Sequence, residues 1–382
     1  VVERRGTDSY KYDMLDPVFG RSDILPMWVA DMDFQSPPEV VAAVAECAAR
    51  GVYGYTFRSR EASQAFVRWV GEQHRWTIAR EWMLASPGVV TALALGVRVL
   101  TEPGDKVLVQ TPVYPPFMSV VKENGRELVT TELVAGDGRY TIDWDDFERK
   151  VAGGVKLFIL CNPHNPVGRQ WTADELRRMG DICLRNGVTI LSDEIHCDLA
   201  LPDHTHTVLA SLSDELAAVT VTLMAPSKTF NIAGTMNSVV VASDPAVRGK
   251  LAAELNALHI NGGNIFGHVA FKAAYEHGAA WRDELRHYLA ANVEAARDFI
   301  ATEMPDVVMY RPEASFLVWL DFRKLGMPHS EVADRLVNIG KVGLNDGRTF
   351  GPGGEGFMRL NVGCPRSVLD DGLRRIKTAF EL

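Results

Sequence analysis

Cysteine is scarce in this chain, and no two cysteines form a short motif. The 382 residues include five cysteines, an odd number, and none of them belongs to a C-x-x-C pair. We therefore expect neither a disulfide scaffold nor a structural zinc site. Such cysteine usage is typical of proteins from a reducing compartment.

Positive charge and long hydrophobic runs are scarce as well. The 40 lysines and arginines are outnumbered by 49 acidic residues, which gives a net charge of −9. That balance argues against nonspecific binding to nucleic acids or to anionic membrane surfaces, both of which need a basic footprint. The longest apolar run, residues 89–100, contains Arg98 and is too short to span a bilayer. Because the first residues also lack an apolar signal core, we expect a soluble, cytoplasmic protein.

The middle of the chain alternates short apolar runs with amphipathic stretches, in a composition (47% hydrophobic, 23% charged) typical of globular proteins. Several runs are nearly continuous in Val and Ile, as in strands buried on both faces. The alternation predicts a mostly parallel sheet flanked by helices. Strands are expected at residues 106–110, 156–161, 189–193, 219–224 and 238–242, and helices at 91–101, 115–124, 172–185 and 245–258. Thr172 and Glu175 would form a capping box.

The C-terminal part has a different pattern, which predicts a smaller α+β domain. A long helical pattern covers residues 280–302, and a final helix follows Pro365. Between them, strands are expected at 316–321 and 358–362, with a helix at 330–339. The first forty residues look irregular and are expected to pack against this part. The predicted division is a large domain of residues 46–278 and a small domain built from residues 1–45 and 279–382.

A glycine-rich segment at residues 351–356, GPGGEG, matches G-x-G-x-x-G by letter. A dinucleotide-binding loop leaves a strand and opens a helix. Here the segment follows a polar stretch and leads into the expected strand at 358–362. We therefore do not expect a Rossmann site.

Three of the predicted strands end in unusual polar segments that contain Asn165, Asp193 and Lys228. Ligands of doubly wound sheets bind at the carboxyl ends of the strands, so these residues are expected to converge. Next to buried runs, an aspartate needs a cationic neighbour, and a lysine must be paired or neutral. Each segment alone has a simpler interpretation as a turn, a cap or a surface loop. Their combination, in this order and spacing, favours a shared site.

Pyridoxal phosphate requires this set of groups. Its aldehyde bonds a lysine amine, and its ring nitrogen needs an acidic partner. Its phosphate suits backbone N–H groups at a helix N-terminus, which the turn at residues 86–91 would supply. Tyr114 could cover the ring.

These motifs resemble fold-type I pyridoxal-phosphate enzymes of the class I/II aminotransferase family. More closely, the chain resembles the MalY/PatB-type cystathionine β-lyases, which are carbon–sulfur β-lyases. The resemblance rests on LPMWVADMDF (25–34), YGYT (53–56), SPGVV (86–90), NPHNPVG (162–168), SDEIH (192–196), SKTFNI (227–232) and RLNVGCPR (359–366). It implies the pyridoxal-phosphate-dependent transferase type I fold and a homodimer with shared active sites.

The resemblance also implies a role for each matching position. Lys228 would be the catalytic lysine, bonded to the cofactor and moving the proton at the substrate Cα. The cofactor would further be held by Gly88, Val89, Val90, Tyr114, Asn165, Asp193, His196 and Ser227, and by Tyr55 reaching from the neighbouring subunit. Arg359 would bind the substrate α-carboxylate. The segment that contains Trp28 and Ala30 would lie close to that carboxylate.

Two positions depart from the pattern of many aminotransferases. Met236 stands where an arginine near the phosphate is common, and His196 where a tyrosine is common. Both departures agree with the lyase subgroup, but they leave open what offsets the phosphate charge and whether His196 touches the cofactor.

No metal site is expected. His204 and His206 could be ligands by spacing, but no third ligand is evident and the segment looks like a surface loop. Cys161 and Cys197 are expected to be packing residues rather than nucleophiles.

Three functions remain open at this stage. The first is a carbon–sulfur β-lyase that cleaves cystathionine or related cysteine thioethers to a thiol, pyruvate and ammonia. The second is an aminotransferase of undefined amino acid specificity. The third is a regulatory binding protein, which the complete cofactor set disfavours because such a protein would be expected to have lost Lys228 or Asp193.

Overall fold

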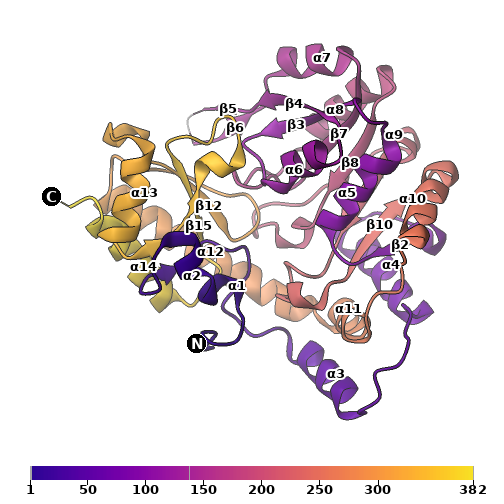
Figure 1. The fold of residues 1–382 in the computed structure, drawn as a ribbon, viewed down its shortest axis with the longest axis horizontal. Helices are drawn as coiled ribbons and strands as arrows, with labels where there is room; N and C mark the ends of the chain where they lie inside the picture. The colour runs from indigo at the N-terminus through magenta and orange to yellow at the C-terminus, as the bar shows by residue number, and fades with distance from the viewer. Residues whose placement is uncertain (1, 137, 382) are drawn as a thin grey trace.

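The computed structural model describes residues 2–136 and 138–381, and its centre is a seven-stranded sheet (Figure 1). The strand order is β2-β10-β9-β8-β7-β3-β4. The strands are β2 (Met83–Ser86), β3 (Lys106–Thr111), β4 (Glu127–Glu132), β7 (Val155–Cys161), β8 (Thr189–Asp193), β9 (Thr220–Met224) and β10 (Ser238–Ala242). Strands β4, β3, β7, β8 and β9 pair in parallel, and β10 runs antiparallel to both β9 and β2. The predicted mostly parallel sheet is therefore confirmed.

Helices cover both faces of this sheet because alternate strand residues point to opposite faces. On one face, Val107 and Ile159 pack with α5 (Val89–Leu100) and α6 (Pro116–Glu123). On the other, Leu108 and Phe158 pack with α7 (Trp144–Ala152) and α8 (Ala173–Arg185). Burial on both faces explains why these strands read as continuous apolar runs. The Thr172–Glu175 capping box opens α8 as predicted.

Five more helices and a short strand pair complete this description of the larger sheet and its surroundings. The helices α4 (Arg60–His74) and α11 (Ile265–His277) share a buried cluster with β9 and β10, and α10 (Pro245–Ala257) follows β10. The short strands β5 (Val134–Ala135) and β6 (Tyr140–Thr141) pair with each other, and α9 (Asp214–Val219) precedes β9. Figure 1 shows α3 (Pro38–Ala49) at the lower edge of the molecule, joined to α4 by an extended segment.

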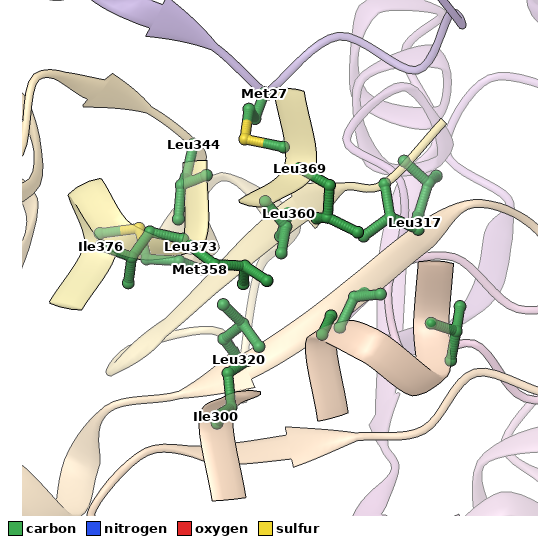
Figure 2. Close-up of a cluster of buried hydrophobic side chains, with 14 of the residues drawn as sticks. Met27, Ile300, Leu317, Leu320, Leu344, Met358, Leu360, Leu369, Leu373 and Ile376 are labelled. Carbon is green, nitrogen blue, oxygen red and sulfur yellow. The ribbon is translucent and has the colours of Figure 1, made fainter. Parts of the chain in front are cut away.

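A smaller antiparallel sheet, in the order β11-β12-β15-β14, lies beside the large one. Its strands are β11 (Val308–Tyr310), β12 (Leu317–Asp321), β14 (Asn345–Asp346) and β15 (Phe357–Asn361), and its helices are α12 (Ala279–Glu303), α13 (His329–Asn338) and α14 (Arg366–Thr378). Its core joins Leu317 and Leu360 to Leu369 and Ile376 of α14 (Figure 2).

The N-terminal segment packs into the same core. Met27 points into the cluster (Figure 2), and β1 (Leu25–Pro26) pairs in parallel with β13 (Val342–Gly343). Two short helices, α1 (Tyr10–Asp13) and α2 (Leu15–Phe19), precede β1, so the expectation of an irregular N-terminus is wrong there. Val40 of α3 instead packs in the cluster that contains α11. The domain limits at residues 45 and 278 stay a prediction.

The GPGGEG segment does not open a helix. It follows the short 3₁₀ turn Gly347–Phe350 and leads into β15. No dinucleotide-binding geometry is present at this segment. None of the helices in the described part of the chain has the length and apolar composition needed to cross a membrane.

Candidate active site

A cavity of about 240 Å³ lies where the carboxyl ends of β7, β8 and β9 meet the N-terminus of α5. The residues that line it include Ala30, Gly88, Val89, Val90, Tyr114, Asn165, Asp193, His196, Ser227 and Lys228. The structure therefore brings together ten of the thirteen residues that the sequence singled out. Trp28, Tyr55 and Arg359 do not line this cavity.

Lys228 follows β9, and its Nζ atom donates a hydrogen bond to the carbonyl oxygen of Ala30 at 2.8 Å. Burial, reinforced by the positive charge of Arg359, lowers the pKa of this amine to about 8. About half of the amine is therefore neutral near pH 8. A neutral amine can attack a carbonyl carbon or accept a proton.

We expect the amine of Lys228 to titrate near pH 8 in the protein without cofactor, because its burial disfavours the charged form. The measurement is a pH titration of the lysine side-chain signals by NMR, with Lys228→Arg used to assign the signal. An unperturbed lysine side chain in a model peptide titrates at about pH 10.4. A Lys228 signal that titrated at that value would contradict this environment.

Asp193 ends β8 and faces the same cavity. One of its carboxylate oxygens, Oδ1, accepts a hydrogen bond from the backbone N–H of Ile195 at 3.0 Å. Burial raises the pKa of Asp193 to about 7, and the neighbouring Glu194 acts in the same direction. A cation placed against this carboxylate would be stabilised and would return it to the charged form.

Asn165 and Tyr114 form an adjoining wall. The Asn165 side-chain oxygen accepts a hydrogen bond from Arg359 at 3.0 Å, and its main-chain oxygen accepts one from the Tyr114 N–H at 3.0 Å. The amide nitrogen of Asn165 is left to donate into the cavity. The loop closes tightly at Gly168, whose φ is +72° and where a Cβ would lie 2.7 Å from Pro312. That close contact explains the glycine of the NPHNPVG motif.

The N-terminus of α5 offers an anion site. Gly88 is the N-cap and provides no side-chain hydrogen bond to the helix. The first intrahelical bond there is donated by Ala92 to the Gly88 carbonyl, so the N–H groups of Val89 and Val90 are not used inside the helix. Ser227 lines the same cavity. Free N–H groups and the helix dipole together favour a phosphate.

Arg359 lies on β15 and is almost fully buried (3% exposed). Its Nη2 atom donates to the Trp28 carbonyl at 2.9 Å and to Asn345 Oδ1 at 2.6 Å. Its Nε atom is buried and has no partner. All its hydrogen-bond acceptors are neutral, and burial lowers its pKa to about 10. A buried guanidinium without an anionic partner favours the binding of a carboxylate.

Side chains from two segments, β15 and the stretch that follows β9, hold residues 28–34 over this site. Besides Arg359 and Lys228, Asn361 donates to the Val29 and Asp31 carbonyls at 2.6 and 2.7 Å. Asn231 donates to the carbonyls of residues 32 and 34 and accepts from the N–H of residue 32. The segment is therefore held in place through its backbone. The side chains around it act mainly by donating hydrogen bonds to its carbonyl groups.

The surroundings of three predicted site residues differ from the roles that the resemblance implies. The Trp28 ring packs against Tyr10 and Phe19, so only its carbonyl reaches Arg359. The Tyr55 side chain is fully exposed and is not among the residues that line the cavity of its own chain. The His196 ring lines the cavity but also bonds Ser315 through Nδ1 at 3.1 Å, and burial lowers its pKa to about 3. His196 is therefore neutral.

The expectation that residues 203–206 form a surface loop is wrong for His206. That ring is buried, and its Nε2 lies 2.7 Å from Glu194 Oε2. Near it, His74 Nε2 lies 2.8 Å from Asp198 Oδ1. These histidines are partners of buried carboxylates. Sequence spacing could not reveal this, because the carboxylates lie on other segments.

Cys161 lines the cavity, and Cys197 is buried next to Asp198. Burial raises the pKa of both thiols, so neither is a thiolate at neutral pH. Their surroundings suit packing residues.

Two functional residues had no sequence signal of their own. Asn237 lines the cavity just before β10, and Asn345 reaches Arg359 from β14. Only side-chain packing between distant segments brings these residues together.

The polar groups around this cavity fit the successive parts of pyridoxal phosphate. A poised lysine, a buried carboxylate, an amide donor and free helix N–H groups line one cavity of suitable polarity. The buried Arg359 Nε, which lacks a partner, lies beyond Asn165.

The comparisons agree with this geometry. The model of the family described as aminotransferase class I and II matches residues 22–376. Cystathionine beta-lyase PatB of Bacillus subtilis is 48% identical over 379 residues, which cover 99% of this chain and 98% of the relative.

Two solved structures with bound pyridoxal phosphate are also similar. One, from Clostridium difficile 630 and described as an aminotransferase, is 44% identical with a TM-score of 0.98, and the match covers 100% of this chain and 98% of that one. The other, a C-S lyase of Staphylococcus hominis, is 32% identical with a TM-score of 0.92, and the match covers 100% and 97%. These matches confirm the type I fold. The chain belongs to the aminotransferase class I and II family.

Proposed function

We propose that this protein is a pyridoxal-phosphate-dependent carbon–sulfur β-lyase. Its substrate would be cystathionine or a related cysteine thioether, and its products a thiol, pyruvate and ammonia. The observation that carries the proposal is one cavity lined by Lys228 and Asp193, with Arg359 bonded to Asn165 in its wall, in a chain 48% identical to a cystathionine β-lyase.

Each part of the cofactor has a candidate partner. Lys228 would bond its aldehyde, Asp193 its ring nitrogen and Asn165 its phenolate oxygen, while Tyr114 would cover the ring. Its phosphate would meet Ser227 and the N–H groups of residues 88–90. When bound, pyridoxal phosphate supplies an electron sink that stabilises negative charge at the substrate Cα.

The side chains then divide the reaction between them. Arg359 would hold the α-carboxylate and fix which bond of Cα faces Lys228. Neutral Lys228 would accept the Cα proton. The Cβ–S bond breaks, the sulfur leaves with the electron pair as a thiolate, and a proton converts it to the thiol. The remaining three-carbon enamine takes up water and yields pyruvate and ammonia, which balances the reaction.

One assay tests this function. The purified protein is incubated with L-cystathionine without any keto acid, and pyruvate and free thiol are measured. We expect both products in equal amounts. Without them, and with activity only after a keto acid is added, the lyase proposal would be wrong.

The alternative is an aminotransferase, which the similarity to the Clostridium difficile protein favours. The same Lys228 would then return the proton to the cofactor instead of allowing the thiolate to leave. This alternative predicts consumption of the keto acid in proportion to amino acid used.

We also propose a homodimer with shared active sites. The extended segment before α4 exposes four large apolar side chains in six residues, Val52, Tyr53, Tyr55 and Phe57. A concentration of this kind is typical of an interface. Val90 and Met236, at the mouth of the cavity, are exposed as well. These surfaces support Tyr55 covering the phosphate end of the neighbouring subunit's site.

Mixing inactive Tyr55→Ala and Lys228→Ala subunits should restore activity. If both defects fall in one site of each hybrid, the other site is intact, and about a quarter of all sites should work after random exchange. The readout is pyruvate release after the mixture is dissociated and reassembled. No recovery in a mixture that forms hybrids would contradict shared sites.

We further propose that the protein works in a reducing compartment such as the cytoplasm. All five cysteines are buried and none is bonded to another. Buried thiols of this kind serve as small packing residues and need no oxidising environment.

A further inference from the structure

Arg58 lies in the extended segment before α4 and reaches toward the sheet. Its Nη2 atom donates to the Ser238 carbonyl at 2.8 Å and to the side-chain oxygen of Asn237. Its guanidinium lies 4.3 Å from the centre of the Phe271 ring. The side chain is thus held in one position by three contacts.

No carboxylate of residues 2–136 or 138–381 forms an ion pair with Arg58. Its hydrogen-bond acceptors are neutral, its Nε atom is buried without a partner, and burial lowers its pKa to about 10. Arg58 is half-buried, and a charge partly withdrawn from water is stabilised by a counter-ion or by a ligand that supplies one. An anionic ligand near Arg58 would therefore be stabilised.

The contacts of Arg58 lead to the phosphate end of the cavity. Asn237, which accepts its hydrogen bond, lines the cavity together with residues 88–91 and Ser227. Ser238 is paired with Ser86, two residues before Gly88. Arg58 therefore lies directly behind the wall that the N-terminus of α5 completes.

The hydrogen bonds of Asn237 orient its amide. Its oxygen faces Arg58, and its nitrogen lies 3.2 Å from Nδ1 of His268. The other ring nitrogen of His268 lies 2.9 Å from the Gly262 carbonyl, so Nε2 carries the proton and Nδ1 accepts. One N–H of Asn237 is left for a ligand in the cavity.

The cavity needs such a cation. A phosphate monoester carries a charge of about −1.5 to −2, whereas a helix N-terminus supplies only about half a positive charge. Among the described residues that line the cavity, Lys228 is the only lysine or arginine, and its amine is engaged at the other end of the cofactor in the proposed function.

We propose that Arg58 is a positioning residue. It orients Asn237, and its positive charge behind Asn237 offsets the negative charge of the phosphate of bound pyridoxal phosphate. The proposal rests on the proposed function, because it assumes that cofactor. It would explain how the phosphate charge is offset in a chain that has Met236 where many aminotransferases have an arginine. It also gives the segment 55–58 two tasks, since Tyr55 would serve the partner's site while Arg58 serves its own.

The test compares two ligands that differ only in the phosphate. The dissociation constants of pyridoxal phosphate and of pyridoxal are measured on the apoprotein by fluorescence quenching, for the wild type and for Arg58→Gln. We expect Arg58→Gln to weaken pyridoxal phosphate roughly tenfold and to leave pyridoxal unchanged, because only the phosphate carries the charge. Arg58→Lys should recover part of the loss.

Arg60→Gln is the matched control, since Arg60 is an exposed arginine two residues away. It should bind both ligands as the wild type does. An equal loss for both ligands in Arg58→Gln would indicate a structural role and overturn the proposal, as would no loss for either. Should Arg58→Gln not fold, Arg58→Met offers an apolar side chain of similar length, and the same selective loss is expected. Wild-type protein that fails to bind pyridoxal phosphate would instead contradict the proposed function.

Discussion

Replacing Lys228 with alanine should lower the rate of pyruvate release from L-cystathionine by roughly 10²–10⁴-fold or more, the usual contribution of a positioned acid–base group. The expected loss is large because the other titratable groups among the described residues that line the cavity are not available as bases. Asp193 would be engaged with the cofactor ring, His196 is neutral with a pKa of about 3, and the thiol of Cys161 is protonated. The reaction rate of the Lys228→Ala variant should therefore fall at the step that removes the Cα proton.

The Lys228→Ala variant should also lose the visible absorbance band that borohydride reduces in the wild-type holoenzyme, because that band requires the lysine–cofactor bond. Lys250→Ala, an exposed lysine of α10, is the matched control and should keep both the band and the activity. Persistence of the band in Lys228→Ala would mean that another lysine bonds the cofactor.

The part of the fold that the sequence predicted is the part buried on both faces. Strands β7 and β8 are central, so nearly every residue is apolar and the runs stand out. The missed strands β2 and β4 are the two edges of the sheet, and they are half-exposed and more polar. Helix α11 was missed because its buried residues occupy several faces, which removes the helical period.

The site residues that come directly after strand ends could be predicted from the sequence. Asn165, Asp193 and Lys228 converge because parallel strands deliver their carboxyl ends to one edge. Arg58 and Asn345 could not be predicted in this way. Their positions depend on side chains that meet across segments about 180 and 14 residues apart, and no local pattern records such packing.

The surroundings of Arg359 differ from those of Arg169, another buried arginine of this protein. Arg169, also buried, is paired with Glu175 and Glu313, whereas the guanidinium of Arg359 has only neutral acceptors and the face of Phe350, 5.0 Å away. Keeping an unpaired charge in the interior is costly. A substrate carboxylate would complete the pair, so binding would regain part of that cost. The gain should be available only to ligands that carry the carboxylate.

Replacing Arg359 with glutamine should therefore lower kcat/KM for cystathionine by roughly 30-fold or more, since losing one partner of a buried charge pair costs about 2–5 kcal/mol. Most of the change should appear in KM, with the cofactor band retained. The decisive measurement compares S-benzylcysteine with its carboxamide. The wild type should strongly prefer the acid, and Arg359→Gln should lose most of that preference, whereas Arg348→Gln, an exposed arginine near the same sheet, should keep it. A preference unchanged in Arg359→Gln would place the carboxylate elsewhere and remove the reason for burying this charge.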